Sequence, residues 1–396
     1  MVKLEPFEVE QWMDKYETTP GVLNIAETCA ASISIDTLVS LCEDPNIPHP
    51  LNTSTKLKYG SIRGSQALRE RLASLYSVRV STPLPAENIL ITPGAISANF
   101  LLLYTLLGPG DHVICEHPTY QQLYDVPRSL GAEVSLWKLR RGQKFIPDLE
   151  DLKELVRDNT KMIIINNPNN PTGSTTPKSV LQGLVDFAKE RDIMILCDEV
   201  YRPLFHSISP ADPDFPPSIV SLGYAKAIST GSMSKAYSLA GIRLGWMACR
   251  DRSIVEAIAS ARDYTTISVS QLDDQVATYA LSQSVLHALL GRNLKLAKTN
   301  VAMLEKFIDR WSDVCSWVRP TSGTTALVKF EKDGKPVEDV QFCLDVLEST
   351  KVMFLPASKC FGAEFKGYVR IGFVCETAVL EEALKQLTLY VRKNLL

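Results

Sequence analysis

Several short stretches of the sequence are apolar at every position, which restricts the folds that the chain can form. Two of them are 162–165 and 193–196, where no polar residue interrupts the run. Because successive side chains of a strand point to opposite faces, a strand that is apolar throughout must be covered on both faces. From about residue 86 such runs alternate with helix-like stretches, as in a sheet whose parallel strands are connected by helices. The sequence therefore predicts an α/β fold with a mainly parallel sheet.

The last third of the sequence has a different pattern, which indicates a second, smaller domain. Helical patterns cover residues 254–261 and 275–311, and candidate strands follow at 325–330 and 369–373, with a helix near 337–349 between them. A chain of 396 residues is long enough for two hydrophobic cores. We expect three parts: an N-terminal segment 1–45 that packs with the small domain, a large domain 46–285, and a small α+β domain 286–396.

Composition and charge argue against several classes of function. Charged residues make up 22% of the chain and leave a net charge of −3, so no global field favours nucleic acid or an anionic membrane. The longest apolar runs, such as Phe100–Leu107, fall short of the ~20 residues of a membrane-spanning helix. The first residues look like neither a signal peptide nor a transit peptide, which predicts a cytoplasmic protein. The nine cysteines and five histidines lack metal-ligand spacing, so we expect reduced, mostly buried thiols and no metal site.

Polar segments follow the apolar runs, at the sheet edge where ligands of open α/β folds bind. Thr92-Pro-Gly-Ala-Ile-Ser-Ala leads from one run into a helix, and the backbone N–H groups of Gly94, Ala95 and Ile96 can seat a phosphate there. Residues 166–173 read Asn-Asn-Pro-Asn-Asn-Pro-Thr-Gly, a rigid polar turn compatible with cis peptides at its prolines. For both segments the alternative is an ordinary connecting turn.

A carboxylate also follows one of these runs, in the segment Asp198-Glu-Val-Tyr. At the end of a buried strand, the Asp198 carboxylate costs free energy unless it has a charged or hydrogen-bonding partner. A protonated pyridine nitrogen would be an adequate partner. The alternative is that Asp198 caps a following helix.

The segment 230–246 carries the most specific signal: Thr-Gly-Ser-Met-Ser-Lys-Ala-Tyr-Ser-Leu-Ala-Gly-Ile-Arg-Leu-Gly-Trp. Lys235 follows a strand end of small residues, and Arg243 lies eight residues later between two glycines. An aldehyde cofactor needs a lysine amine to form a covalent bond, and its phosphate needs hydroxyls and a guanidinium. The alternative, a solvated surface lysine, does not account for Ser232, the glycines and Arg243 around it.

These motifs resemble those of the class I/II aminotransferases, a branch of the fold type I enzymes that use pyridoxal 5′-phosphate (PLP). The resemblance extends from Tyr59-Gly-Ser-Ile-Arg-Gly-Ser-Gln-Ala-Leu-Arg-Glu to Arg370 and so covers nearly the whole chain. It implies an aminotransferase-like fold with a large PLP-binding domain. It also implies an enzyme that exchanges the amino group of an α-amino acid with a keto acid.

The resemblance assigns a role to each matching residue, with Lys235, Asp198 and Tyr201 as the catalytic ones. Lys235 would hold the cofactor as an imine and move a proton between the substrate Cα and the cofactor C4′, while Asp198 would pair with the pyridine nitrogen. Tyr59 would reach the phosphate from the neighbouring subunit of a homodimer. By the same resemblance, Asn170 and Tyr201 would donate to the phenolic oxygen, and Tyr120 would stack on the ring. The phosphate would be held by Ser232, Arg243 and the turn of Gly94, Ala95 and Ile96. The substrate α-carboxylate would be bound by Arg370 with Asn170.

The N-terminal part departs from the common pattern of the family. Where ordinary members have a Gly-x-Pro turn, residues 24–34 read Asn-Ile-Ala-Glu-Thr-Cys-Ala-Ala-Ser-Ile-Ser, which leaves the substrate and the reaction type open. Residues 10–16 and 27–32 also resemble, more weakly, capreomycidine synthase, a PLP enzyme that forms a ring by replacement. A PLP-dependent lyase or cyclase is therefore the alternative. A regulator that only senses PLP is not expected, since only a short segment precedes the domain.

Overall fold

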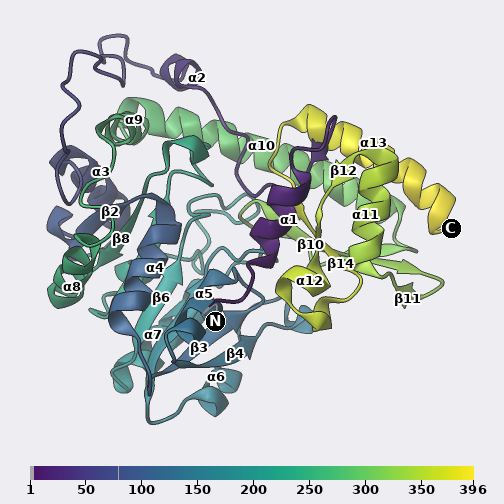
Figure 1. Cartoon of the computed structure of the whole chain (residues 1–396), viewed down its shortest axis with the longest axis horizontal. Coiled ribbons are helices and arrows are strands. Elements are labelled where there is room, and N and C mark those ends of the chain that lie inside the picture. The colour runs from purple at the N-terminus through teal and green to yellow at the C-terminus, as the bar shows by residue number, and fades with distance from the viewer. Residues whose placement is uncertain (1–3, 79) are drawn as a thin grey trace.

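A mainly parallel sheet forms the larger part of the molecule, as the apolar runs predict. In the computed structural model, which describes residues 4–78 and 80–396, seven strands form this sheet (Figure 1). The first three residues of the expected segment 1–45 lie outside the described residues. β8 is antiparallel to both neighbours, and the other strand pairs of this sheet are parallel. In spatial order the strands are β2 (Ile89–Thr92), β8 (Gly245–Cys249), β7 (Ala227–Ser232), β6 (Met194–Asp198), β5 (Thr160–Asn166), β3 (His112–His117) and β4 (Glu133–Lys138).

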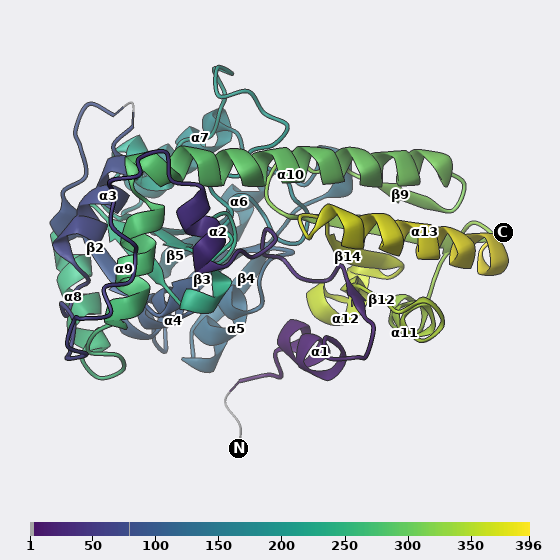
Figure 2. The same ribbon diagram turned by 90° about the horizontal axis from the view of Figure 1, so that it is seen from above.

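A second sheet, of five strands within the same described residues, lies in the C-terminal third. Its central strand β10 pairs antiparallel with β9, β11 and β14, and β13 pairs with β14. The long helix α10 runs beside both sheets (Figure 2). The elements are α10 (Gln283–Arg310), β9 (Cys315–Trp317), β10 (Thr325–Lys332), β11 (Lys335–Pro336), α11 (Asp339–Thr350), β13 (Leu355–Pro356), α12 (Ala357–Phe361), β14 (Tyr368–Gly372) and α13 (Thr377–Asn394).

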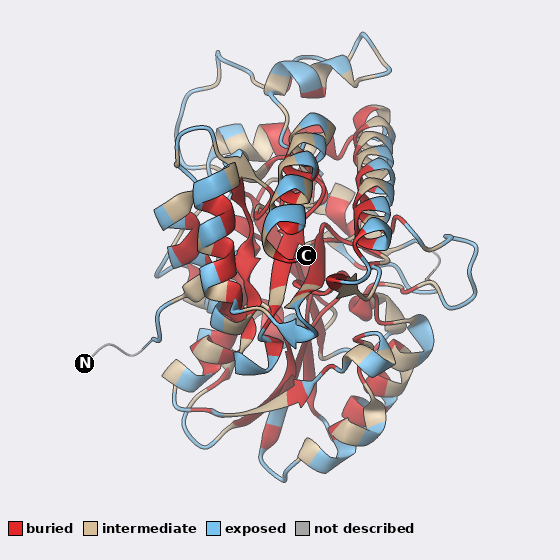
Figure 3. Ribbon diagram, turned by 90° about the vertical axis from the view of Figure 1, so that its right-hand side faces the viewer, coloured by how far each residue is buried: buried red, intermediate tan, exposed pale blue. Residues whose placement is uncertain are grey.

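Apart from the edge strand β4, the strands of the large sheet are buried on both faces (Figure 3). Ile163 and Ile165 of β5 belong to one hydrophobic cluster, whereas Met162 and Ile164 belong to a second cluster on the other face. None of the helices in residues 4–78 and 80–396 has the length and apolar character that crossing a membrane requires. The helices around the large sheet are α3 (Gln66–Tyr76), α4 (Gly94–Leu106), α5 (Gln122–Ser129), α6 (Leu149–Leu155), α7 (Lys178–Glu190), α8 (Arg252–Arg262) and α9 (Gln271–Ala280).

One helix prediction is wrong: the pattern over 275–311 is two helices. α9 ends at Ala280, and α10 begins at Gln283, because Ser282 has extended backbone angles (φ −69°, ψ 151°) at the N-cap of α10. Serine is among the residues that helices favour at this position. The expected domain boundary between 285 and 286 falls inside α10, and the division into domains stays a prediction.

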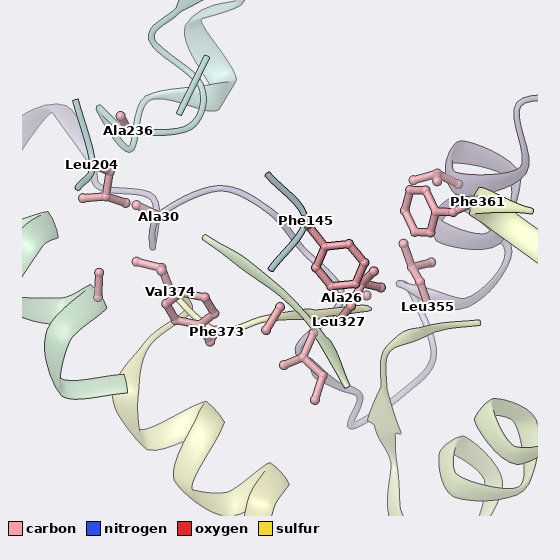
Figure 4. Packing of buried hydrophobic residues seen from close by; sticks show 14 of the residues in the cluster. Ala26, Ala30, Phe145, Leu204, Ala236, Leu327, Leu355, Phe361, Phe373 and Val374 are labelled. Carbon is pink, nitrogen blue, oxygen red and sulfur yellow. The ribbon is translucent and has the colours of Figure 1, made fainter. Parts of the chain in front are cut away.

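The N-terminal segment bonds through its backbone to the smaller sheet and to the segment that follows β7. Its elements are α1 (Glu8–Tyr16), β1 (Leu23–Asn24) and α2 (Ile35–Ser40), and β1 pairs with β12 (Val352–Met353). Gly372 N donates to Ile25 O at 2.7 Å, and Ala30 N donates to Lys235 O at 3.1 Å. A Cβ at position 372 would lie 1.8 Å from Glu27 O, so this close approach requires glycine. Figure 4 shows Ala26 and Ala30 among the buried side chains of the larger cluster.

Candidate active site

The carboxyl ends of β5, β6 and β7 and the N-terminal segment enclose a cavity of about 580 Å³. This volume lies within the ~300–1,000 Å³ that is common for small-molecule sites. Two of the predicted site residues do not line this cavity: Gly94 directly precedes the lining residue Ala95, and Tyr59 lines a different hollow. The other predicted site residues all line the cavity: Ala95, Ile96, Tyr120, Asn170, Asp198, Tyr201, Ser232, Lys235, Arg243 and Arg370.

Lys235 lies three residues beyond the end of β7 and faces the N-terminal segment. Its Nζ donates to Thr28 Oγ1 at 2.6 Å and to Cys29 Sγ at 3.5 Å, and it lies 3.6 Å from Glu27 Oε1. Burial lowers the pKa of Lys235, but Cys29, Tyr201 and Glu27 raise it by more, so the pKa lies above its ordinary value. The amine is therefore an ammonium here and must lose a proton before it can attack a carbonyl group.

Asp198 ends β6 and is 4% exposed. Its Oδ2 accepts a hydrogen bond from Asn99 Nδ2 at 2.8 Å, and its Oδ1 accepts one from Val200 N at 3.1 Å. Asn99 is held in turn by Thr230, whose Oγ1 donates to Asn99 Oδ1 at 2.7 Å. Burial raises the pKa of Asp198 to about 6, although these hydrogen bonds oppose the shift. A turn rather than a helix follows, so the alternative in which Asp198 caps a helix is wrong.

An anion cradle lies where α4 begins. Gly94 has φ +78°, and a Cβ there would lie 2.9 Å from Arg243 Nη2, so glycine leaves the space that the guanidinium uses. No side chain caps the first N–H groups of α4. Arg243 Nη1 also lies 3.4 Å from Ser234 Oγ, and Ser234 N donates to Ser232 Oγ at 3.2 Å. Free helix N–H groups beside a guanidinium and two hydroxyls fit a phosphate group.

Arg370 lies in β14 of the smaller sheet and reaches the same cavity, where it is 2% exposed. Its Nη1 donates to Asn170 Oδ1 at 3.2 Å and its Nη2 donates to Ala26 O at 2.8 Å. Its Nε has no hydrogen-bond partner among the described residues. Both prolines of the turn 166–173 have cis peptide bonds, and this turn brings Asn170 to the arginine. A buried guanidinium with an unused donor is suited to a carboxylate ligand.

The two remaining tyrosines differ in position. Tyr120 lines the cavity, and its hydroxyl donates to Glu10 Oε1 at 2.9 Å. Tyr59 is 77% exposed and lines a separate hollow with Leu57 and Leu272. A single chain does not test the expectation that Tyr59 acts in a neighbouring subunit.

Sequence reasoning connected the altered turn of residues 24–34 with the substrate but named no site residue in the N-terminal segment. The spacing of three acidic residues in α1 and at its end was an available signal, because positions 10, 14 and 17 lie on one face of a helix. Asn99 was another, as a polar residue within the apolar stretch of α4. The missed lining residues are Val9, Glu10, Met13, Asp14, Glu17, Ala26, Glu27, Thr28, Cys29, Asn99, Asn166, Val200, Ser234 and Ala240.

Comparisons with known proteins agree with this geometry. The sequence model of the family described as aminotransferase class I and II matches residues 46–387. The crystal structure of a PLP-dependent aminotransferase from Streptococcus suis aligns with a TM-score of 0.88 at 39% identity, covering 99% of each chain. Aspartate aminotransferase of Thermotoga maritima is 29% identical over 84% of this chain and 83% of its own length. Capreomycidine synthase of Streptomyces vinaceus is 29% identical over 80% and 77%. The chain therefore belongs to the family of class I and II aminotransferases, and it is a PLP-dependent enzyme.

Proposed function

We propose that this enzyme transfers the amino group of an α-amino acid to a keto acid in the cavity around Lys235. The observation that carries the proposal is that one cavity holds both the Lys235 amine and the buried Arg370 guanidinium with its unpartnered Nε. An amine bonds to the aldehyde of PLP, and a guanidinium matches the α-carboxylate of an amino acid. When bound, PLP supplies the electron sink for the bond that breaks at the substrate Cα.

The residues around Lys235 are suited to hold the cofactor. Asp198, backed by Asn99, would bind the pyridine nitrogen, because a buried carboxylate gains from a cationic partner. Lys235 would carry the cofactor on Nζ and, once that nitrogen is released, remove the proton from Cα. The phosphate would be bound by Ser232, Arg243 and the N–H groups of Gly94, Ala95 and Ile96. The phenolic oxygen would accept from Asn170 and Tyr201. The ring face would stack on Tyr120.

Incubation of the PLP form with a panel of amino acids tests the reaction. We expect a keto acid and the amino form of the cofactor, identified by mass spectrometry and absorbance. An eliminated or cyclised product, with the cofactor returned unchanged, would identify a lyase or cyclase instead.

A lyase or cyclase is the second candidate function. The observation that favours it is the contact of Lys235 with Glu27, Thr28 and Cys29, which stand where ordinary family members have a different turn. The similarity to capreomycidine synthase also supports it. A carboxylate and a thiol beside the amine are groups that can move the second proton that a replacement reaction requires.

Arg370→Lys is expected to lower kcat/KM for α-amino acids about 100-fold, because lysine keeps the charge but loses the two-pronged geometry that orients the carboxylate. Steady-state kinetics should show a much smaller loss with the corresponding amines, which have no carboxylate. Arg141→Lys is the matched control, since Arg141 binds the Tyr368 hydroxyl and does not line the cavity. Equal losses for amino acids and amines would mean that Arg370 is structural.

We also propose a homodimer in which Tyr59 completes the partner's site. Leu57, which lines the same hollow as Tyr59, is 76% exposed, and Tyr264 elsewhere in the chain is 93% exposed. Sedimentation should show a dimer. Mixing inactive Lys235→Ala with a weak Tyr59→Ala variant should restore activity, because half of the sites in hybrid dimers then have both native residues. If Tyr59 acted within its own chain, mixing would restore nothing.

Two further expectations belong to this proposal. We propose that residues 46–285 and 286–396 form two domains, with 1–45 packing on the smaller one, which limited proteolysis of the PLP form would test. A cytoplasmic location is likewise proposed, and fractionation of the native host would test it.

A further inference from the structure

Apart from Asp198, the acidic residues that line the cavity all belong to the N-terminal segment, whereas its cations come from later parts of the chain. Its cations are Lys235, Arg243 and Arg370, and each already has a proposed partner in the cofactor or the substrate carboxylate. The N-terminal part of the lining carries carboxylates that have no such partner. They are Glu10, Asp14, Glu17 and Glu27.

Helix α1 directs three of these carboxylates to the cavity. Positions 10, 14 and 17 share one helix face, which also presents Val9 and Met13 to the cavity. The helix is fixed to both parts of the molecule by contacts of Glu8. Glu8 N donates to Gln121 Oε1 at 3.0 Å, and Glu8 Oε2 pairs with Lys359 Nζ at 2.6 Å.

Helix stability does not explain this arrangement. Like charges three and four residues apart repel, and acidic residues near a helix C-terminus interact unfavourably with the helix dipole. Among the ion pairs of residues 4–78 and 80–396, that of Glu27 with Lys235 is the only one that involves any of the four. Burial and the charges of Glu27, Asp14 and Glu10 raise the pKa of Glu17, as expected for acids that lack a cation.

Under the proposed function, the ion pair of Glu27 with Lys235 is broken while the amine is bonded to the cofactor. Burial raises the pKa of Glu27, but the Lys235 charge and hydrogen bonds from Cys29 and Thr28 lower it by more, to about 2. Beside the Lys235 ammonium, Glu27 is therefore charged at neutral pH. Under the proposed function the Lys235 amine is bonded to the cofactor, which leaves Glu27 without its cation.

An independent feature fixes the other end of the ligand. Arg370 is 2% exposed and lines the same cavity, and its guanidinium has no carboxylate partner among the described residues, so it calls for an anion at that end. Resting on the proposed function, we propose that the enzyme prefers α-amino acids whose side chain ends in a positive charge, an ammonium or a guanidinium. Arg370 would bind the carboxylate, and Glu10, Asp14, Glu17 and Glu27 would surround the distal cation.

A matched pair of unreactive ligands tests this preference by calorimetry on the PLP form. δ-Guanidinovalerate and δ-ureidovalerate have the same shape and carboxylate, lack an α-amino group, and differ in the distal charge. We expect the guanidino compound to bind about ten-fold more tightly, with the difference shrinking as salt is added. Equal affinities, or tighter binding of the ureido compound, would overturn the proposal.

The double variant Asp14→Asn with Glu17→Gln assigns the preference to α1. It should remove most of the ten-fold advantage of the guanidino compound and leave δ-ureidovalerate binding unchanged. Both positions are exposed and the substitutions relieve repulsion, so folding should be retained, as thermal melting would confirm. Glu154→Gln, on the exposed side of α6, is the charge-matched control and should change neither affinity. An unchanged advantage in the double variant would refute the assignment to α1.

Turnover of arginine and lysine against citrulline and norleucine separates this inference from the proposed function. A higher kcat/KM for arginine and lysine would support both the transaminase function and the preference for a positively charged side chain. If neutral or acidic amino acids are converted faster, the preference is wrong and the transaminase remains. If no amino acid yields a keto acid, the proposed function itself is wrong, whatever the calorimetry shows.

Discussion

Lys235→Ala is expected to lower the turnover of every amino acid by about 10⁴-fold, the largest effect of any single substitution in the chain. The variant loses both the amine that bonds the cofactor and the group that moves the proton at Cα. The Nζ partners Thr28 and Cys29 would remain in place, since both backbone N–H groups donate to Glu27 Oε1 and Thr28 O accepts from Thr324 Oγ1. Single-turnover absorbance measurements with PLP and excess amino acid would give the rate.

Covalent labelling makes the same assignment without relying on activity. Borohydride reduction of the PLP form should fix the cofactor to Lys235, which peptide mass spectrometry would locate. Lys226→Ala is the control: this lysine directly precedes β7, pairs with Asp192 and does not line the cavity, so its loss should leave the labelling intact. Labelling at another lysine, or full turnover in Lys235→Ala, would show that the assignment is wrong.

Asp198→Ala is expected to lower turnover by about 10³-fold or more, because it removes the buried charge that stabilises a protonated pyridine nitrogen. Bonding of the cofactor to Lys235 should survive, since that step does not need the electron sink. The substitution also leaves the buried Asn99 amide without its acceptor, at a cost of ~1–3 kcal/mol of stability. Stopped-flow absorbance would separate the surviving bonding step from the slowed proton removal.

Asp198→Asn distinguishes the electrostatic role from a packing role. Asparagine keeps the size of the side chain and an oxygen that can accept from Asn99, so stability should return while turnover stays low. Asp186→Asn, at an exposed position of α7, is the control for a lost carboxylate. Near-normal turnover in either Asp198 variant would mean that the enzyme does not use the ring as a full electron sink.

The large sheet was predictable because its strands are apolar at every position, a pattern that only burial on both faces explains. The cavity followed from a rule of topology: parallel strands end at one edge, so segments after β5, β6 and β7 had to meet there. The break between α9 and α10 has only a weak signal, the N-cap residue Ser282, because neither Leu281 nor Ser282 is a glycine or proline. The contact of Lys235 with Thr28 was not predictable, because Thr28 lies 207 residues away and has no local signature.

The segment around Glu27 is attached to the rest of the molecule by main-chain atoms. Gly372 N to Ile25 O and Ala30 N to Lys235 O are bonds that any side chain leaves intact. A protein engineer can therefore build a library at positions 28 and 29 that keeps these two bonds, whereas the Glu27 side chain itself accepts from the N–H groups of Thr28 and Cys29. Position 372 must stay glycine in such a library, because the carbonyl oxygen of residue 27 lies where a Cβ would be, whichever amino acid stands there.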